Sequence, residues 1–138
     1  ALSSFELKNN RSQVIDIHGK EIILDAYNAN PTSVSNAIES FSNVENSKAI
    51  ILGDMFELGN NSHDEHKKIV ELLSIKNIDS CYFIGEDFFK VKSTNESFYF
   101  YRTKDDFYNS DDEISESHIL IKGSRGMKME EIIKNKLK

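Results

Sequence analysis

Leu24-Asp25-Ala26-Tyr27-Asn28-Ala29-Asn30-Pro31 joins an apolar strand to a helix through a short polar loop. The apolar run that ends at Leu24 predicts a buried strand. Asn30 is typical of a helix N-cap, and Pro31 of a first helical position, where a missing N–H costs nothing. The polar side chains of this loop therefore crowd one rim, where a ligand can bind. The same pattern also fits a well-capped turn with incidental polar residues.

Periodicity on both sides of this loop predicts strands that alternate with helices. We expect strands at 13–17, 21–26, 48–52, 81–84, 98–101 and 119–121, and helices around 34–41, 62–73, 88–91 and 129–137. Ser62 to Glu65 has the form of a capping box for the second helix, and Phe107 with Tyr108 is expected at the periphery. Parallel strands need crossover helices. We therefore expect one α/β domain over residues 1–138, with a Rossmann-like, mostly parallel sheet, helices on both faces and an N-terminal β-hairpin.

Glycine or asparagine follows four of the expected strands. These loops are 27–30, 53–55, 85–87 and 122–126. In open α/β sheets, ligands bind beyond the carboxyl ends of the strands, near the switch in strand order. We therefore expect the four loops to converge on one crevice.

Composition narrows the class of partner. The 138 residues carry 23 acidic and 17 basic side chains, a net charge of -6, which disfavours an electrostatic grip on nucleic acid or on a membrane surface. The single cysteine, Cys81, lies in an apolar run, so no disulfide framework is possible and a reducing compartment is expected. With no membrane-spanning run and no signal-peptide pattern in the sequence, we expect a cytoplasmic protein. We also expect a monomer.

The loop 122–126 is basic and carries a hydroxyl group. The sequence has no Gly-x-x-x-x-Gly-Lys-Ser/Thr loop and no Gly-x-Gly-x-x-Gly turn, so it lacks the usual cradles for a triphosphate or a dinucleotide. Lys122, Ser124 and Arg125, with the N–H groups at the start of the last helix, are suited to bind a carboxylate or an anionic intermediate. The same residues also fit a capped turn whose charged side chains are only solvated.

The histidines and the remaining acidic residues point less clearly to a functional role. His66 lies on the apolar stripe of its helix, where a histidine is more often packed in the core than catalytic. No histidine or cysteine pair has the spacing of metal ligands, so no metal site is predicted. Asp54 follows a strand and is either a turn former or part of the crevice wall, and Glu57 fits either role.

Three motifs in this order and spacing resemble the C-terminal domain of the Mur ligase family. They are Asp25 to Pro31, then Gly53-Asp54-Met55-Phe56-Glu57-Leu58-Gly59 with Ser62 and His66, then Lys122-Gly123-Ser124-Arg125 with Met129-Glu130-Glu131. The resemblance runs from about Arg11 onward. It implies a three-domain, cytoplasmic, ATP-dependent ligase of bacterial peptidoglycan synthesis, of the kind that joins D-alanyl-D-alanine to UDP-N-acetylmuramoyl-tripeptide.

The same resemblance implies a division of labour between domains. ATP and Mg²⁺ would bind mainly in a central domain outside this chain, and this domain would close over them and bring the dipeptide. The residues implied on the ATP side are Asp25, Tyr27, Asn28, Asn30 and Arg11, with Asp25 near the ribose and Arg11 at the hinge. The residues implied on the dipeptide side are Lys122, Ser124 and Arg125. No catalytic residue is expected within this domain alone, and the isolated domain is expected to be inactive.

Two other classes stay open at this point. The C-terminal domain of another Mur ligase, or of a folylpolyglutamate-type ligase, would have the same fold and a different amino acid substrate. A non-enzymatic, flavodoxin-like binding module would share the order of strands and helices, but it would need a flavin-binding loop or an acidic phosphoacceptor cluster that the sequence does not place.

Overall fold

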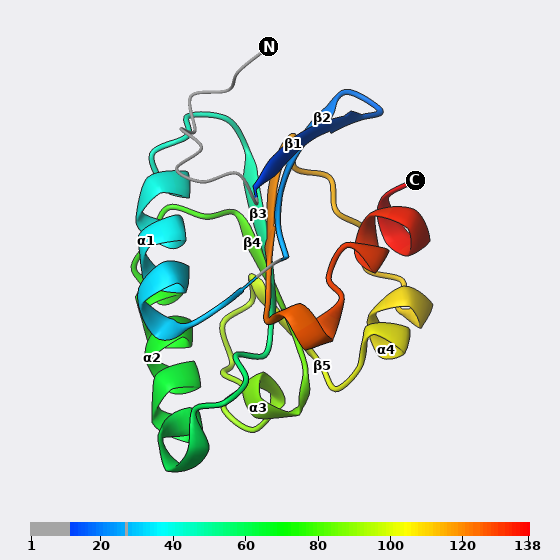
Figure 1. Cartoon of the computed structure of the whole chain (residues 1–138). Helices are drawn as coiled ribbons and strands as arrows, with labels where there is room; N and C mark the ends of the chain where they lie inside the picture. The colour runs from blue at the N-terminus through cyan, green and yellow to red at the C-terminus, as the bar shows by residue number, and fades with distance from the viewer. Residues whose placement is uncertain (1–11, 27) are drawn as a thin grey trace.

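The computed structural model describes residues 12–26 and 28–138, and these form a sheet of six strands between two layers of helices (Figure 1). The strands are β1 (Gln13–Ile17), β2 (Lys20–Asp25), β3 (Lys48–Gly53), β4 (Ser80–Ile84), β5 (Phe98–Tyr101) and β6 (His118–Lys122). Their order across the sheet is β1-β2-β6-β3-β4-β5. Only β1 is antiparallel to its neighbour, so the predicted hairpin and the predicted parallel sheet are both confirmed.

The last strand in the sequence lies in the middle of the sheet. β6 pairs with β2 on one side and with β3 on the other, and Lys122 is opposite both Asp25 and Leu52. The loop that follows β6 therefore emerges between the loop after β2 and the loop after β3.

Three helices cover one face of the sheet. They are α1 (Pro31–Phe41), α2 (Ser62–Ser74) and the short α3 (Glu86–Phe89). The apolar stripe of α1, which ends at Phe41, packs with Ile69 and Leu73 of α2 over inward-facing strand residues such as Ile50 and Phe83. This cluster is the larger of two cores.

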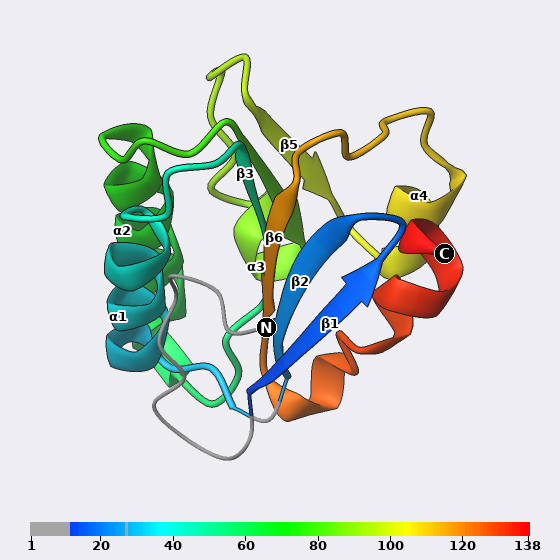
Figure 2. The same cartoon turned by 90° about the horizontal axis from the view of Figure 1, so that it is seen from above.

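The opposite face is covered by α4 (Lys104–Asn109) and the C-terminal segment, which lie side by side in Figure 2. Phe107 is fully buried here against Tyr82 and Tyr101, so the expectation that it packs at the periphery was wrong. A segment of six residues gives no helical stripe that would mark this phenylalanine as core. Helices therefore lie on both faces, as predicted.

The two predicted helix starts have different outcomes. Asn30 caps α1: its side-chain oxygen accepts the N–H of Ser33 at 2.8 Å, and the Ser33 hydroxyl accepts the N–H of Asn30 at 3.1 Å. Ser62, by contrast, is not the N-cap of α2. The 3₁₀ turn η1 (Gly59–Asn61) runs directly into the helix, so Ser62 already has helical backbone angles and its side chain lies near His66 instead.

The closing helix is shorter than predicted. After β6 comes a 3₁₀ turn, η2 (Arg125–Met127), and the chain ends in a π-helical turn, η3 (Ile133–Leu137). Met129 and Ile132 are buried as expected, but residues 129 and 130 form a turn after Lys128, which has left-handed backbone angles, so the helix begins two residues later than the apolar spacing predicted. No helix among the described residues has the length and apolar character needed to cross a bilayer.

Candidate functional site

The loops after β2, β6, β3 and β4 meet at the carboxyl edge of the sheet and are bonded to one another. The N–H of Ser124 donates to the carbonyl of Asp54 at 3.2 Å, and the N–H of Phe56 donates to the Ser124 hydroxyl at 2.8 Å. The N–H of Asp54 donates to the carbonyl of Ile84 at 3.2 Å. These loops therefore meet at one edge of the sheet, as predicted.

Glycines let the two central loops approach closely. A Cβ atom on Gly123 would lie 3.2 Å from the Cα atom of Gly53 and 2.6 Å from the side chain of Met129. A real side chain therefore does not fit at position 123 unless the buried methionine and the backbone both move.

Lys122 lies at the end of β6 and is almost fully buried. Its ammonium group is 2.7 Å from a carboxylate oxygen of Asp25 and 3.0 Å from the backbone carbonyl of Asn28. The structure therefore places Lys122 under the loop that was expected on the ATP side, although the residue was grouped with the dipeptide side. The Asp25–Lys122 pair ties that loop to the central strand.

Ser124 and Arg125 lie on the other side of this edge. Ser124 is buried, and its hydroxyl oxygen accepts the N–H of Phe56. The hydroxyl hydrogen has no acceptor among the described residues, so it is available to a ligand. Arg125 is exposed and begins η2, so the cationic group and the hydroxyl stand next to each other in the chain. Ser124 precedes this single 3₁₀ turn and Arg125 is its first residue, whereas the sequence predicted the N-terminus of a longer helix here.

Asp54 is a buried turn former. Its two carboxylate oxygens accept the backbone N–H groups of Asp87 at 2.9 Å and Phe88 at 3.0 Å, which caps α3. Gly85 has a φ of 132°, and a Cβ atom there would collide with this carboxylate. Burial raises the pKa of the Asp54 carboxyl, and the two N–H donors oppose that rise without cancelling it.

His66 is packed in the core and fully hydrogen-bonded. The N–H of Met55 donates to its Nε2 at 3.0 Å, so the ring hydrogen lies on Nδ1, which is 2.7 Å from the carbonyl oxygen of Ser62. The edge of the ring packs on Phe88 with the centroids 4.6 Å apart. Of the two interpretations of His66, the structure supports the packed residue, which holds the loop after β3 in place.

One group of side chains has the spacing of a metal site. Ligand atoms of Asp54, His66 and Asp87 all lie within 4.8 Å of one another. However, the Nε2 lone pair of His66 faces the N–H of Met55, and both Asp54 oxygens accept backbone N–H groups. These donor atoms are already used, so the group fits a hydrogen-bonded brace and does not fit a Mg²⁺ site.

The structure describes some of the remaining candidates for the ATP side. Asn28 is exposed and accepts Lys122 through its carbonyl, whereas the side-chain oxygen of Asn30 is used to cap α1. Tyr27 and Arg11 lie outside the described residues. Glu57 is exposed with a φ of 66°, a left-handed turn that a sequence pattern does not reveal.

Sequence reasoning assigned no role to Phe56. This side chain is 43% exposed at the carboxyl edge, although it belongs to an apolar residue type. The only signal in the sequence is a phenylalanine inside a loop bounded by Gly53 and Gly59.

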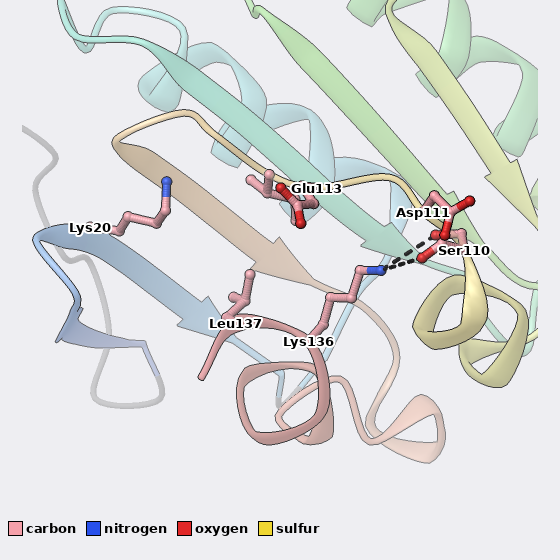
Figure 3. A pocket seen from close by; sticks show the side chains of 7 residues that line it. Lys20, Ser110, Asp111, Glu113, Lys136 and Leu137 are labelled. Atoms are coloured by element: carbon pink, nitrogen blue, oxygen red, sulfur yellow. Dashed lines mark hydrogen bonds between the residues drawn. The ribbon is translucent and has the colours of Figure 1, made fainter.

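A pocket of about 500 Å³ lies away from this edge, between the start of β2, the segment after α4 and the turn η3 (Figure 3). Its two lysines are already engaged. Lys136 donates to the carbonyl of Ser110 at 3.1 Å, and Lys20 donates to the carbonyl of Glu116 at 2.9 Å. None of the predicted site residues that the structure describes lines this pocket.

Comparison with known proteins gives a consistent result. Residues 10–125 match the sequence model of a family described as "Mur ligase, glutamate ligase domain". The UDP-N-acetylmuramoyl-tripeptide--D-alanyl-D-alanine ligase of Bacillus subtilis is 34% identical over 97% of this chain and 32% of its own length. The protein of the same name from Rickettsia prowazekii is 30% identical over 96% of this chain and 31% of its own length. The chain thus spans about a third of the length of these relatives.

Solved structures share the fold. MurF from Acinetobacter baumannii superposes with a TM-score of 0.79 at 24% identity, covering 94% of this chain and 30% of that one. MurF ligase from Thermotoga maritima, solved in complex with ADP, superposes with a TM-score of 0.69 at 20% identity over 95% of this chain and 31% of that one.

Proposed function

Because the chain belongs to the Mur ligase family, as its glutamate ligase domain, we propose that it is the C-terminal domain of an ATP-dependent ligase that adds D-alanyl-D-alanine to UDP-N-acetylmuramoyl-tripeptide. The relatives that match nearly the whole chain carry this activity in their names. Family membership leaves no support for a flavodoxin-like binding module.

The position of the loop after β6 is the structural observation that supports the proposal. The loop after β6 emerges between the loops after β2 and β3, so a nucleotide-facing loop and an anion-facing loop share one edge. A domain that closes on two substrates needs such an arrangement, because closure must bring the reacting atoms to about 3 to 3.5 Å from each other.

We assign the dipeptide carboxylate to Ser124 and Arg125. The Ser124 oxygen already accepts the N–H of Phe56, so its hydrogen can be donated to a carboxylate oxygen, and Arg125 adds a positive charge beside it. Lys122 does not share this task in our proposal, because its ammonium group is buried against Asp25 and Asn28.

We assign the nucleotide to the loop that contains Asp25 and Asn28. One Asp25 oxygen accepts Lys122, which leaves the other as an acceptor for a sugar hydroxyl. ATP, when bound, supplies the phosphoryl group that activates the tripeptide carboxylate. The sequence has no Gly-rich phosphate-binding motif, and the donor atoms that Asp54 and His66 bring to their group with Asp87 are engaged in hydrogen bonds, which supports binding of the phosphates and Mg²⁺ mainly by a central domain.

On closure, this domain would position the dipeptide amine and keep water from the activated carboxylate. We propose that the whole ligase acts in the cytoplasm as a monomer and has no nucleic-acid or membrane partner. The net charge of -6 and the free, buried Cys81 support this proposal.

The test is ADP release by the full-length ligase, given UDP-N-acetylmuramoyl-tripeptide with and without D-alanyl-D-alanine. Ser124→Ala should raise the KM for the dipeptide about tenfold or more, because it removes a hydrogen bond to a charged group. Asn28→Ala should act on the KM for ATP. Ser74→Ala, an exposed serine at the end of α2, serves as the matched control.

Turnover that depends on glutamate or on another amino acid, and not on the dipeptide, would keep the family and overturn the named substrate. Absence of ATP consumption with every acceptor would overturn the proposed function altogether.

A further inference from the structure

Two large apolar side chains are exposed among the described residues. They are Phe56, at 43% exposure, and Ile75, at 78%. Ile75 follows the C-terminal end of α2, on the approach to the amino end of β4. Phe56 instead lies at the carboxyl edge, where its backbone N–H donates a hydrogen bond to the Ser124 hydroxyl.

Phe56 is held in its place by contacts on several sides. Its N–H donates to the Ser124 hydroxyl at 2.8 Å, and the N–H of the preceding Met55 donates to buried His66 at 3.0 Å. Its ring lies over Gly126, where a Cβ atom would come within 2.9 Å of the ring carbon Cε2. The absence of a side chain at position 126 makes room for the ring. An exposed phenylalanine is thus fixed beside the Ser124 hydroxyl to which we assign the dipeptide carboxylate, and its ring lies over Gly126, the residue after Arg125.

D-Alanyl-D-alanine carries one carboxylate and two methyl groups. Ser124 and Arg125 can serve the carboxylate but not the methyl groups, and small-molecule sites combine a few polar groups with an apolar wall. We propose that Phe56 is that wall: its exposed ring contacts the methyl groups of the dipeptide and limits the size of the side chains that the ligase accepts. The inference rests on the proposed function and names a specificity-determining residue for it.

The experiment uses the full-length ligase with Phe56→Ala, Phe56→Leu and Gly126→Ala, and with Ile75→Ala as the matched control for loss of an exposed apolar side chain. ADP release is measured against D-alanyl-D-alanine and against a dipeptide with a larger second side chain. KM values are also measured for ATP and for the UDP-linked tripeptide. Thermal unfolding checks that each variant is folded.

We expect Phe56→Ala to raise the KM for D-alanyl-D-alanine roughly tenfold, as loss of an apolar contact does in binding pockets. Phe56→Leu should lie between Phe56→Ala and the parent. The KM values for ATP and for the tripeptide should change less than twofold. The ratio of kcat/KM between the larger dipeptide and D-alanyl-D-alanine should rise in Phe56→Ala. Gly126→Ala, which displaces the ring, should also raise the dipeptide KM, and Ile75→Ala should change nothing.

An active parent with an unchanged dipeptide KM in Phe56→Ala would overturn this inference and leave the proposed function in place. A similar rise in all three KM values would also overturn it, because Phe56 would then contact a neighbouring domain and not the dipeptide. A parent that consumes no ATP with any dipeptide would overturn the proposed function, and this inference with it.

Discussion

Lys122 and Asp25 form an almost buried ion pair, and loss of this pair should lower the free energy of unfolding. Lys122→Met leaves the Asp25 carboxylate without its cation, so we expect the free energy of unfolding to fall by about 3 kcal/mol. The double variant with Asp25→Asn should recover much of that loss, because no uncompensated charge remains. Urea unfolding of the four proteins in this cycle measures the coupling. Additive losses would show that the two side chains do not interact.

Asp54 should give the protein a stability that depends on pH. Folding raises the pKa of this carboxyl above its ordinary value of 3.8, mainly through burial. The folded state therefore holds the proton more tightly, and the resulting stability is present below that value and is lost as the pH rises through the folded pKa.

The matching variant is Asp54→Asn, which does not titrate. We expect the unfolding free energy of the parent, minus that of the variant, to decrease as the pH rises from about 3.5 to 7. Chemical unfolding at several pH values gives this difference directly. A difference that increases with pH would contradict the assigned direction of the pKa shift.

The start of α1 depends on a reciprocal cap between Asn30 and Ser33. Asn30→Ala removes the acceptor of the Ser33 N–H, so we expect it to lower the free energy of unfolding by about 1 kcal/mol. Asn30→Asp keeps an acceptor there and should retain most of the stability. Equal losses in the two variants, measured by urea unfolding, would mean that the cap contributes little.

The N-terminal ends of α1 and α2 show which local sequence signals are enough to predict where a helix begins. Asn30 and Pro31 were predictable because the cap and the first turn are neighbours in the sequence. Ser62 has an equally good capping pattern, yet the turn η1 extends the helix backwards and removes the need for a cap. Whether the preceding residues continue the helix depends on the packing of the loop after β3, which a four-residue motif does not record.

For the molecule as a whole, we expect this domain alone to be inactive as a ligase. Most contacts of ATP and of the tripeptide would come from the parts of the relatives that this chain does not match. Binding of D-alanyl-D-alanine or ATP to the isolated chain should therefore be millimolar or weaker, as an order of magnitude. Titration calorimetry or NMR shifts test this prediction. A tight, ATP-independent complex with the dipeptide would contradict it.

The strands, most helices and the four polar loops were predictable from residue patterns of short period. The alternation of apolar runs with helical stripes determined an α/β sheet with helices on both faces, because crossovers between parallel strands require them. Loops at the carboxyl ends of parallel strands lie along one edge of the sheet whatever the strand order. The buried core of α1 and the whole of β3 follow from the same patterns.

Other features follow from contacts between distant parts of the chain. The insertion of β6 between β2 and β3 places Lys122 against Asp25, although 97 positions separate them in the sequence. The same pairing places Ser124 beside the N–H of Phe56 and leaves the aromatic ring exposed over Gly126. Local periodicity records which face of an element is buried, whereas strand order and side-chain partners depend on long-range pairing. For this reason the sequence alone determined the edge at which the candidate site lies, and the folded chain determined which side chains meet there.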